Sequence, residues 1–430
     1  MNIQSPKTTK DKNKLLVIWL LITSGVVTVY LLVSTGIDGY WIWGKEEIRY
    51  DVTGQIGDFI GGVIGTIISA AGFYFLYLTL NAQRESSLDQ SNAFERERLE
   101  NKYFELVKMH RENVAELSFE RTIILENHPR YKFDYEIVER KKVFRAIFKQ
   151  FATCVNDLKP LITKVDRIYT SEFKKIILAN PIVKEYDFDL VLLAKIDICY
   201  CIVFYGVGAE GLLILERILK KRYKPNFIER VLRFISLKPS DDEEILNKWM
   251  KLSKRSSKSN KRILTAEIYN WRETKKLPAS LGELDKENAI SEIVENYHNR
   301  YTKYYGGHQF RLGHYFRHLF QTVKFINNQS KLSYNDKYEY VKILRAQLST
   351  YEQAVLFINS LSTMGYAWEL DPQIPEHLSA WGRKNFELIT KYNMIKNLPE
   401  EGLFGIPFKE LFPKVLYEGD GKRRDNSFCK

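Results

Sequence analysis

Two apolar runs decide the fold of this 430-residue chain: LLVIWLLITSGVVTVYLLV at residues 15–33 and FIGGVIGTIISAAGFYFLYLTL at residues 59–80. Neither run contains a charged residue, and the runs are 19 and 22 residues long. A helix of about 20 apolar residues crosses the hydrocarbon core of a bilayer. The sequence therefore predicts an N-terminal transmembrane hairpin at residues 15–80, with spans at 15–33 and 59–80.

The flanking charges predict the orientation of this hairpin. The tail at residues 1–14 holds four lysines and one aspartate, whereas the loop between the runs holds five acidic and two basic residues. Because lysine-rich short flanks stay on the cytoplasmic side, both termini are expected in the cytoplasm. A cleaved signal peptide is the competing interpretation of the first run, but the run is long for one and a second span follows.

Small residues recur every four positions along the second run: Gly57, Gly61, Gly65 and Ser69. A stripe of small side chains lets another helix approach closely within a membrane. Two partners remain open, the first span of the same chain and a second copy of the chain in a homo-oligomer.

The rest of the chain has the composition of a helical protein, because proline and glycine are sparse outside the hairpin. The expected fold class is all-α. We expect a juxtamembrane helix at 81–125, a helical cytoplasmic domain at 126–370 and a C-terminal tail region at 371–430, with disorder from Glu418 to Lys430. Within the domain, apolar periodicity predicts helices at Leu312 to Asn328 and Lys337 to Met364.

Most of the formal charge of +12 lies in a basic segment at residues 217–262. Its expected basic surface comprises Lys220, Lys221, Arg222, Lys224, Lys254, Arg255, Lys258, Lys261 and Arg262. Anionic lipid is the nearest partner for such a surface beside a membrane, and nucleic acid is the second candidate. A solvated polar segment without a partner is the alternative.

Two histidines, His314 and His318, stand four residues apart, which is the spacing of a helical zinc pair. Tyr315 occupies the position at which a zinc protease needs its glutamate, so that class is excluded, and no metal or cofactor is expected. We expect a buried polar network that joins the helix of these histidines to the Lys337–Met364 helix. Its expected members are His314, His318, Gln321, Arg345, Ser349 and Glu352.

No phosphate-binding loop, dinucleotide fingerprint or serine-nucleophile motif is present in the sequence. Helical nucleases of prokaryotic defence systems place an arginine and a histidine on one helix with four to six residues between them. The chain misses that spacing, because seven residues lie between Arg300 and His308 and two between Arg311 and His314. If the protein is an enzyme, His314, Arg317 and His318 are the catalytic candidates.

Several blocks of the sequence resemble a known family. The blocks are Gly57–Gly62, Tyr103–Leu106 with His110 and Glu112–Val114, Phe204–Gly208, Gly313–Phe320 with Lys324–Ile326, and Leu344–Ser349 with Tyr351 and Glu352. Together they are similar to the AbiC-like phage abortive infection proteins of bacteria. The resemblance implies a membrane-anchored component of anti-phage defence in the bacterial inner membrane, and it supplies no catalytic residue.

The leading hypothesis is a non-enzymatic defence protein, in which a cytoplasmic helical sensor is coupled to a two-span membrane effector. The phage trigger is not specified by the sequence. A membrane-tethered ribonuclease acting in abortive infection is the alternative, so the question of an enzyme stays open.

Overall fold

The computed structural model describes residues 7–37, 50–127, 130–240, 242–253, 267–268, 270, 303–372, 386–399 and 405–418. The chain divides into two compact units, Met1–Asn101 and Lys102–Lys430. Each unit is described by itself.

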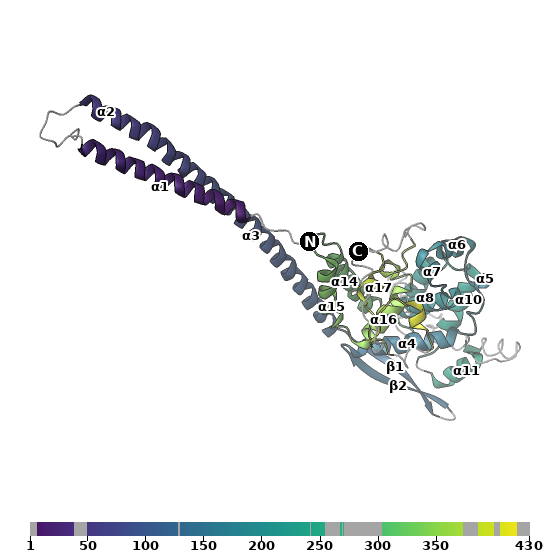
Figure 1. The fold of residues 1–430 in the computed structure, drawn as a ribbon. Helices are drawn as coiled ribbons and strands as arrows, with labels where there is room; N and C mark the ends of the chain where they lie inside the picture. The colour runs from purple at the N-terminus through teal and green to yellow at the C-terminus, as the bar shows by residue number, and fades with distance from the viewer. Residues whose placement is uncertain are drawn as a thin grey trace, which may run out of the picture. The chain divides into compact units, whose positions relative to one another are not determined.

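The described residues of the first unit form helices (Figure 1). These are α1 (Lys7–Ile37), α2 (Tyr50–Phe59), the π-helical turn η1 (Ile60–Ile64) and the first part of α3 (Gly65–Ala115). The wide turn η1 includes Gly61 and Gly62, and it packs against α1. Ile64 and Ala71 are buried, seven residues apart, which is the spacing of one helix face.

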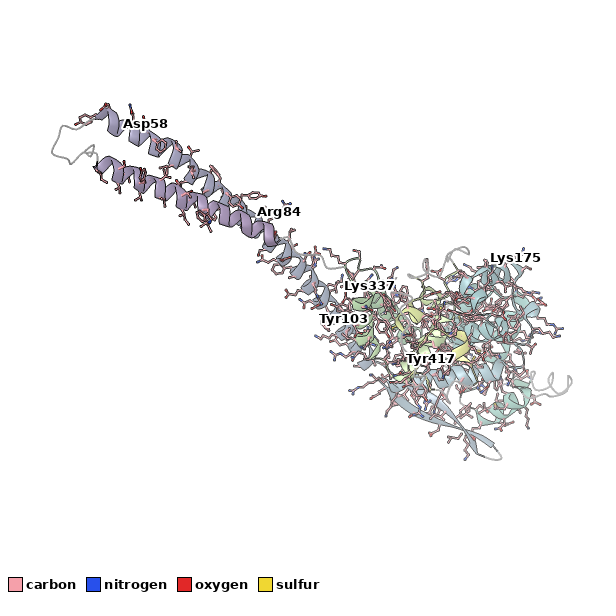
Figure 2. The ribbon with its side chains drawn as sticks, viewed as in Figure 1. Asp58, Arg84, Tyr103, Lys175, Lys337 and Tyr417 are labelled. Atoms are coloured by element: carbon pink, nitrogen blue, oxygen red, sulfur yellow. The ribbon has the colours of Figure 1, made fainter. Side chains whose placement is uncertain are left out.

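One helix in the described part of the chain, Gly57–Ala115, is long and apolar enough to cross a membrane. Asp58 and Arg84, labelled in Figure 2, enclose its uncharged part. Within the described side chains of α1, a shorter apolar helix, Leu21–Ser34, falls below the length of a span. The described residues thus offer one candidate span, and the two-span hairpin expected at residues 15–80 remains a proposal.

The segment after α3 forms a β-hairpin, which the expected all-α fold and the juxtamembrane helix at 81–125 did not include. Strand β1 (Ser118–Asn127) pairs antiparallel with β2 (Arg130–Glu139), and Ser118 lies opposite Glu139. Both strands are rich in β-branched and aromatic residues, which favour extended backbone. The helical expectation was therefore wrong beyond Ala115, although the described chain is mostly helical.

Helices make up most of the second unit. They are α4 (Lys142–Leu158), α5 (Val165–Ile168), α6 (Ser171–Ala179), α7 (Pro181–Glu185), α8 (Leu190–Tyr205), α9 (Ala209–Leu219), α10 (Pro225–Ser236), α11 (Glu243–Ser253), α14 (Gln309–Asn327), α15 (Tyr334–Arg345), α16 (Thr350–Ser360), the 3-10 turn η2 (Tyr366–Trp368), α17 (Leu388–Tyr392) and α18 (Phe408–Leu411).

The core of this unit forms around α8, whose sequence is apolar on every side. A helix of that kind must be covered on all faces. Accordingly α8 packs against α4, α5, α9, α14 and α16. Its buried Asp197 accepts hydrogen bonds from Tyr223 Oη at 2.6 Å and from Thr363 N at 2.6 Å, which ties α8 to the segment after α16.

Two boundaries differ from the sequence-based expectation. The helix expected from Lys337 to Met364 is broken into α15 and α16, because Ser349 caps the second helix. The region at 371–430 is not a tail throughout, since Leu388, Ile389 and Phe412 are buried in the core. The disorder expected from Glu418 concerns residues that, after Glu418 itself, lie outside the described ones.

Candidate functional site

α14 begins at a close backbone contact between Gly206 and the segment Gly306–Gly307. Gly206 has a φ of +76° and Gly307 a φ of +91°, a region that favours glycine. A Cβ on Gly206 would lie 2.6 Å from the carbonyl carbon of Gly306, so only glycine permits this approach. The backbone hydrogen bond from His308 N to Phe204 O, at 2.8 Å, fixes the end of α8 beside the start of α14.

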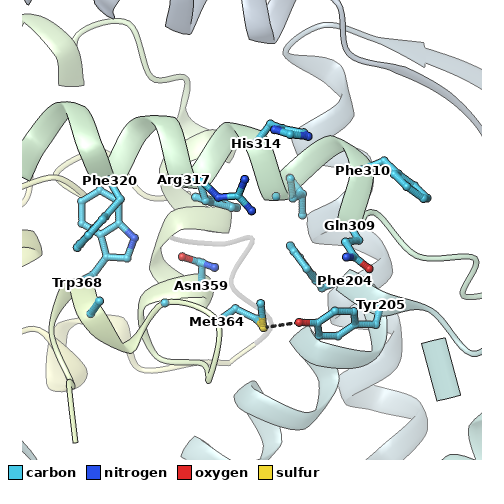
Figure 3. A pocket seen from close by; sticks show the side chains of 15 residues that line it. Phe204, Tyr205, Gln309, Phe310, His314, Arg317, Phe320, Asn359, Met364 and Trp368 are labelled. Carbon is cyan, nitrogen blue, oxygen red and sulfur yellow. Dashed lines mark hydrogen bonds between the residues drawn. The ribbon is translucent and has the colours of Figure 1, made fainter. Parts of the chain in front are cut away.

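A cavity of about 520 Å³ lies beside this contact (Figure 3). α14, the end of α8 and the segment from Asn359 to Trp368 form its walls. Its lining residues are Phe204, Tyr205, Gln309, Phe310, Leu312, Gly313, His314, Phe316, Arg317, Phe320, Asn359, Met364, Gly365, Ala367 and Trp368. We call this space the α14 cavity.

The charge in the α14 cavity is positive. Arg317 points into it from α14, and His314 lies one turn earlier at its edge (Figure 3). Both side chains are exposed, and among the described residues neither has a hydrogen bond or an ion pair. No aspartate or glutamate is among the lining residues. The cavity therefore favours an anionic group.

The floor of the cavity is polar and tightly packed. Asn359 is 2% exposed, and its Nδ2 donates to Tyr200 Oη at 3.1 Å, whereas its Oδ1 accepts no hydrogen bond within the described chain. Tyr205 Oη donates to Met364 Sδ at 3.2 Å. A Cβ on Gly365 would lie 2.3 Å from Asn359 O, so glycine is required at this wall.

His318 lies in a different environment, which we call the histidine joint. Its ring stacks on His110 of α3 at 6.4 Å between centroids, and His110 lies 5.2 Å from the ring of Tyr315. Glu352 of α16 accepts from Tyr315 Oη at 3.1 Å, and its Oε1 lies 3.9 Å from His110 Nε2.

The surroundings of this joint disfavour the protonated form of both histidines. Burial, followed by the charges of His318 and Lys141, lowers the pKa of His110 to about 4. Burial also lowers the pKa of His318. The ring nitrogens of both histidines are buried without a hydrogen-bond partner in the described part of the chain. The described residues contain no group of three or more His, Cys, Asp or Glu side chains arranged to hold a metal ion.

The predicted polar network is thus divided. His314 and Gln321 are exposed, so neither belongs to a buried network. Ser349 caps α16 by a reciprocal capping box with Glu352. Arg345 instead donates to Tyr392 O at 2.9 Å, at the end of α17. Sequence reasoning missed Tyr315, which is the residue that joins α14 to Glu352.

The expected basic surface is likewise divided. Lys221 and Lys224 are exposed and Lys220 is half-buried, but Arg222 stacks over Phe173 at 5.2 Å and lies 4.0 Å from Asp197 Oδ2. Arg222 is therefore a packed core cation. The remaining members lie outside the described residues: Lys254, Arg255, Lys258, Lys261 and Arg262.

In the first unit, the small-residue stripe is open. Gly57, Gly61 and Ser69 are exposed, Gly65 is half-buried, and a Cβ added to Gly57 or Gly61 would meet no atom within 4 Å. η1, where Ile64 is buried, contacts α1.

The comparison with known protein families matches a segment that includes most of the residues lining the α14 cavity. Residues 307–403 match the model of a family described as "Putative phage abortive infection protein". The match confirms the resemblance over this segment, which carries all the cavity residues except Phe204 and Tyr205. Searches of the curated proteins and of the solved structures gave no match.

Proposed function

We propose that this chain is a membrane-anchored abortive infection protein, in which the helical unit at residues 102–430 senses infection and α3 passes the response to the bilayer. The family match supports the role in abortive infection. The uncharged part of Gly57–Ala115 supports the anchor. The lysine-rich tail and the acidic loop support a protein of the bacterial inner membrane with both termini in the cytoplasm.

The observation that carries this proposal is the continuity of α3. One helix of 51 residues contains the apolar segment near its start and buried core side chains near its end. Tyr103, Val107, His110 and Val114 are these buried residues. We infer that a change of packing around His110 is passed along this helix to the apolar segment.

Breaking α3 between its two parts tests the coupling. Ser91 is exposed, and proline at this position removes a helix hydrogen bond and kinks the helix. We expect Ser91→Pro to stay in the membrane and to keep its melting temperature but to lose phage defence, whereas Ser91→Ala keeps all three properties. Full defence by Ser91→Pro would overturn the coupling.

The topology has its own test. An enzyme reporter that is active only in the periplasm, fused after Lys430, should be inactive, and the same reporter inserted in the loop at residues 38–49 should be active. The reverse result would contradict the proposed orientation.

A second copy of the chain is the partner we propose for the small-residue stripe. The open face at Gly57 and Gly61 supports it, because small residues at an interface let membrane helices pack closely. Leucine at both Gly61 and Gly65 should abolish crosslinking between copies and phage defence. Ala70→Leu, on the other side of the same helix, should keep both. Crosslinking that persists in the double variant would contradict this role of the stripe.

Anionic lipid and nucleic acid remain the proposed partners of the exposed Lys221 and Lys224. Lys224 Nζ also donates to Asp166 O at 2.6 Å, so part of its donor capacity is already used. Flotation with vesicles that contain anionic lipid, compared with the variant carrying alanine at both lysines, measures this contribution. Equal flotation of the two proteins would remove the lysines from lipid binding.

A membrane-tethered ribonuclease is the second candidate. His314 and Arg317 favour it, because both line one open cavity. Against it, His318 lies at the histidine joint, and no carboxylate among the lining residues could share proton transfer with His314. Membrane potential and RNA integrity should be followed together in infected cells. RNA cleavage that precedes depolarisation and is lost in Arg317→Ala would replace the leading proposal.

A further inference from the structure

We propose that the α14 cavity binds a mononucleotide, with the base against the aromatic walls and the phosphate at Arg317. This inference rests on the proposed sensing function for its role in defence, and it names the class of signal that the sensor would receive. The binding itself follows from the size, the walls and the charge of the cavity.

The size and the walls of the cavity suit a flat ring. Its volume of about 520 Å³ lies within the range of pockets that hold small ligands. Phe320 and Trp368 form an edge-to-face pair at 5.0 Å, and Phe204 and Tyr205 form another at 4.9 Å. Phe204 and Trp368 are buried, so the half-buried rings of Phe320 and Tyr205 are the members of these pairs on which a nucleobase can stack.

The charge of the cavity selects a phosphate over a neutral ligand. Arg317 has no acidic neighbour among the lining residues. Its planar guanidinium can donate two parallel hydrogen bonds to phosphate oxygens, which a lysine cannot do. His314 is a second nitrogen donor at the edge of the same cavity.

An amide side chain provides contacts for the edge of a base. Gln309 is exposed beside the start of α14 and offers both a donor and an acceptor (Figure 3). Asn359 lies opposite, and its Oδ1 lacks a donor within the described chain. This oxygen is enclosed and packed against Gly365, so Gln309 is the amide side chain that is open to the edge of a base.

The binding test uses the full chain purified in detergent. The probes are the four ribonucleoside 5′-monophosphates, the matching nucleosides, inorganic phosphate and a tetraribonucleotide, each followed by calorimetry and by the shift in melting temperature. We expect at least one monophosphate to bind about tenfold more tightly than its nucleoside and than phosphate, because ring and phosphate contribute together. No binding by any monophosphate would overturn the proposal, and so would binding of the tetranucleotide alone or of phosphate as tightly as any monophosphate.

Variants assign the binding to this cavity. Arg317→Ala should weaken the monophosphate about tenfold or more. Arg111→Ala, which removes an exposed arginine of α3 outside the cavity, should bind as the unaltered chain does. Equal weakening by both variants, or by neither, would overturn the assignment. Binding is measured on purified protein and coupling by Ser91→Pro in cells, so failure of one proposal is distinguishable from failure of the other.

Discussion

α14 carries polar side chains in two different surroundings, the α14 cavity and the histidine joint. In the cavity, Arg317 and His314 are exposed and lack an acidic partner among the lining residues. In the joint, Glu352 is fully buried and His110 is 2% exposed. Open, uncompensated charge is available to a ligand, whereas buried polar groups determine how α3, α14 and α16 pack. The comparison teaches that two histidines four residues apart on one helix can lie in different surroundings, one open and one packed.

The largest effect should come from removing the carboxylate of the joint. Glu352 accepts from Tyr315 Oη at 3.1 Å and from Ser349 N at 2.8 Å. Glu352→Ala leaves the buried Tyr315 hydroxyl and the part-buried Ser349 N unpaired and should lower the free energy of unfolding by about 4 kcal/mol. Chemical denaturation of the full chain in detergent measures this change. A loss below about 1 kcal/mol would show that the joint is not a structural element.

The next effect concerns the pH dependence of the joint. Because the pKa of His110 is about 4 in the folded chain and ordinarily 6.5, the unfolded chain binds more protons between these values. Stability should therefore fall as the pH falls, by about 2.5 kcal/mol from this group between pH 7 and pH 4.5. His318, Lys141, Glu352 and Tyr315 are the titratable groups that the described residues place around it.

The variant His110→Phe isolates this contribution. Burial lowers the pKa of His308 to about 3. His308 therefore adds a similar pH dependence of stability to both proteins, and its contribution cancels in the difference. Unfolding is compared at pH 7 and pH 4.5, and the variant should lose less stability than the unaltered chain. Equal losses in the two proteins would contradict a neutral, buried His110.

A smaller effect is expected at the wall of the α14 cavity. Gly365→Ala would bring a Cβ to 2.3 Å from Asn359 O and should cost about 2 kcal/mol. Gly313→Ala is the matched control, because its Cβ would meet only Phe204 Cζ, at 3.9 Å. Alanine there should stabilise the helix by up to about 1 kcal/mol. Thermal unfolding of the pair separates them, and equal shifts would show that the wall is not tightly packed.

Periodicity in the sequence predicted α14 well, because Leu312, Leu319 and Ile326 repeat at intervals of seven and are all buried. Periodicity could not show that His314 is exposed while His318 packs against His110. Residues four apart differ by only about 40° around a helix, so their surroundings depend on the neighbouring elements. α3 packs on one side of α14, and the Asn359–Trp368 segment packs on the other. Both contacts join residues that are distant in sequence, so a local sequence pattern cannot predict them.

Other features carried a local signal that the sequence interpretation did not use. Ser349 followed three residues later by Glu352 is a capping-box signature, which predicts the break between α15 and α16. In β2, Tyr131, Phe133 and Tyr135 alternate with polar residues, which is a strand pattern. The sequence contains no proline or glycine between Asn81 and Pro129. The helix was therefore expected to continue beyond residue 115, where the strand begins instead.

The smallest change in stability should come from His314, and it separates the two surroundings most directly. Because His314 is exposed and has no partner among the described residues, His314→Leu and His314→Gln should each shift the free energy of unfolding by less than about 0.5 kcal/mol.

If His314 only completes the anion site beside Arg317, the glutamine variant keeps part of the defence through its amide donor, and the leucine variant loses more. If it exchanges protons in a reaction, neither replacement serves, since glutamine does not titrate near neutral pH. Stability, phage survival and RNA integrity are measured on both variants. A stable His314→Gln protein with no defence and no RNA cleavage would favour the ribonuclease, and a leucine variant that unfolds would return His314 to the buried network.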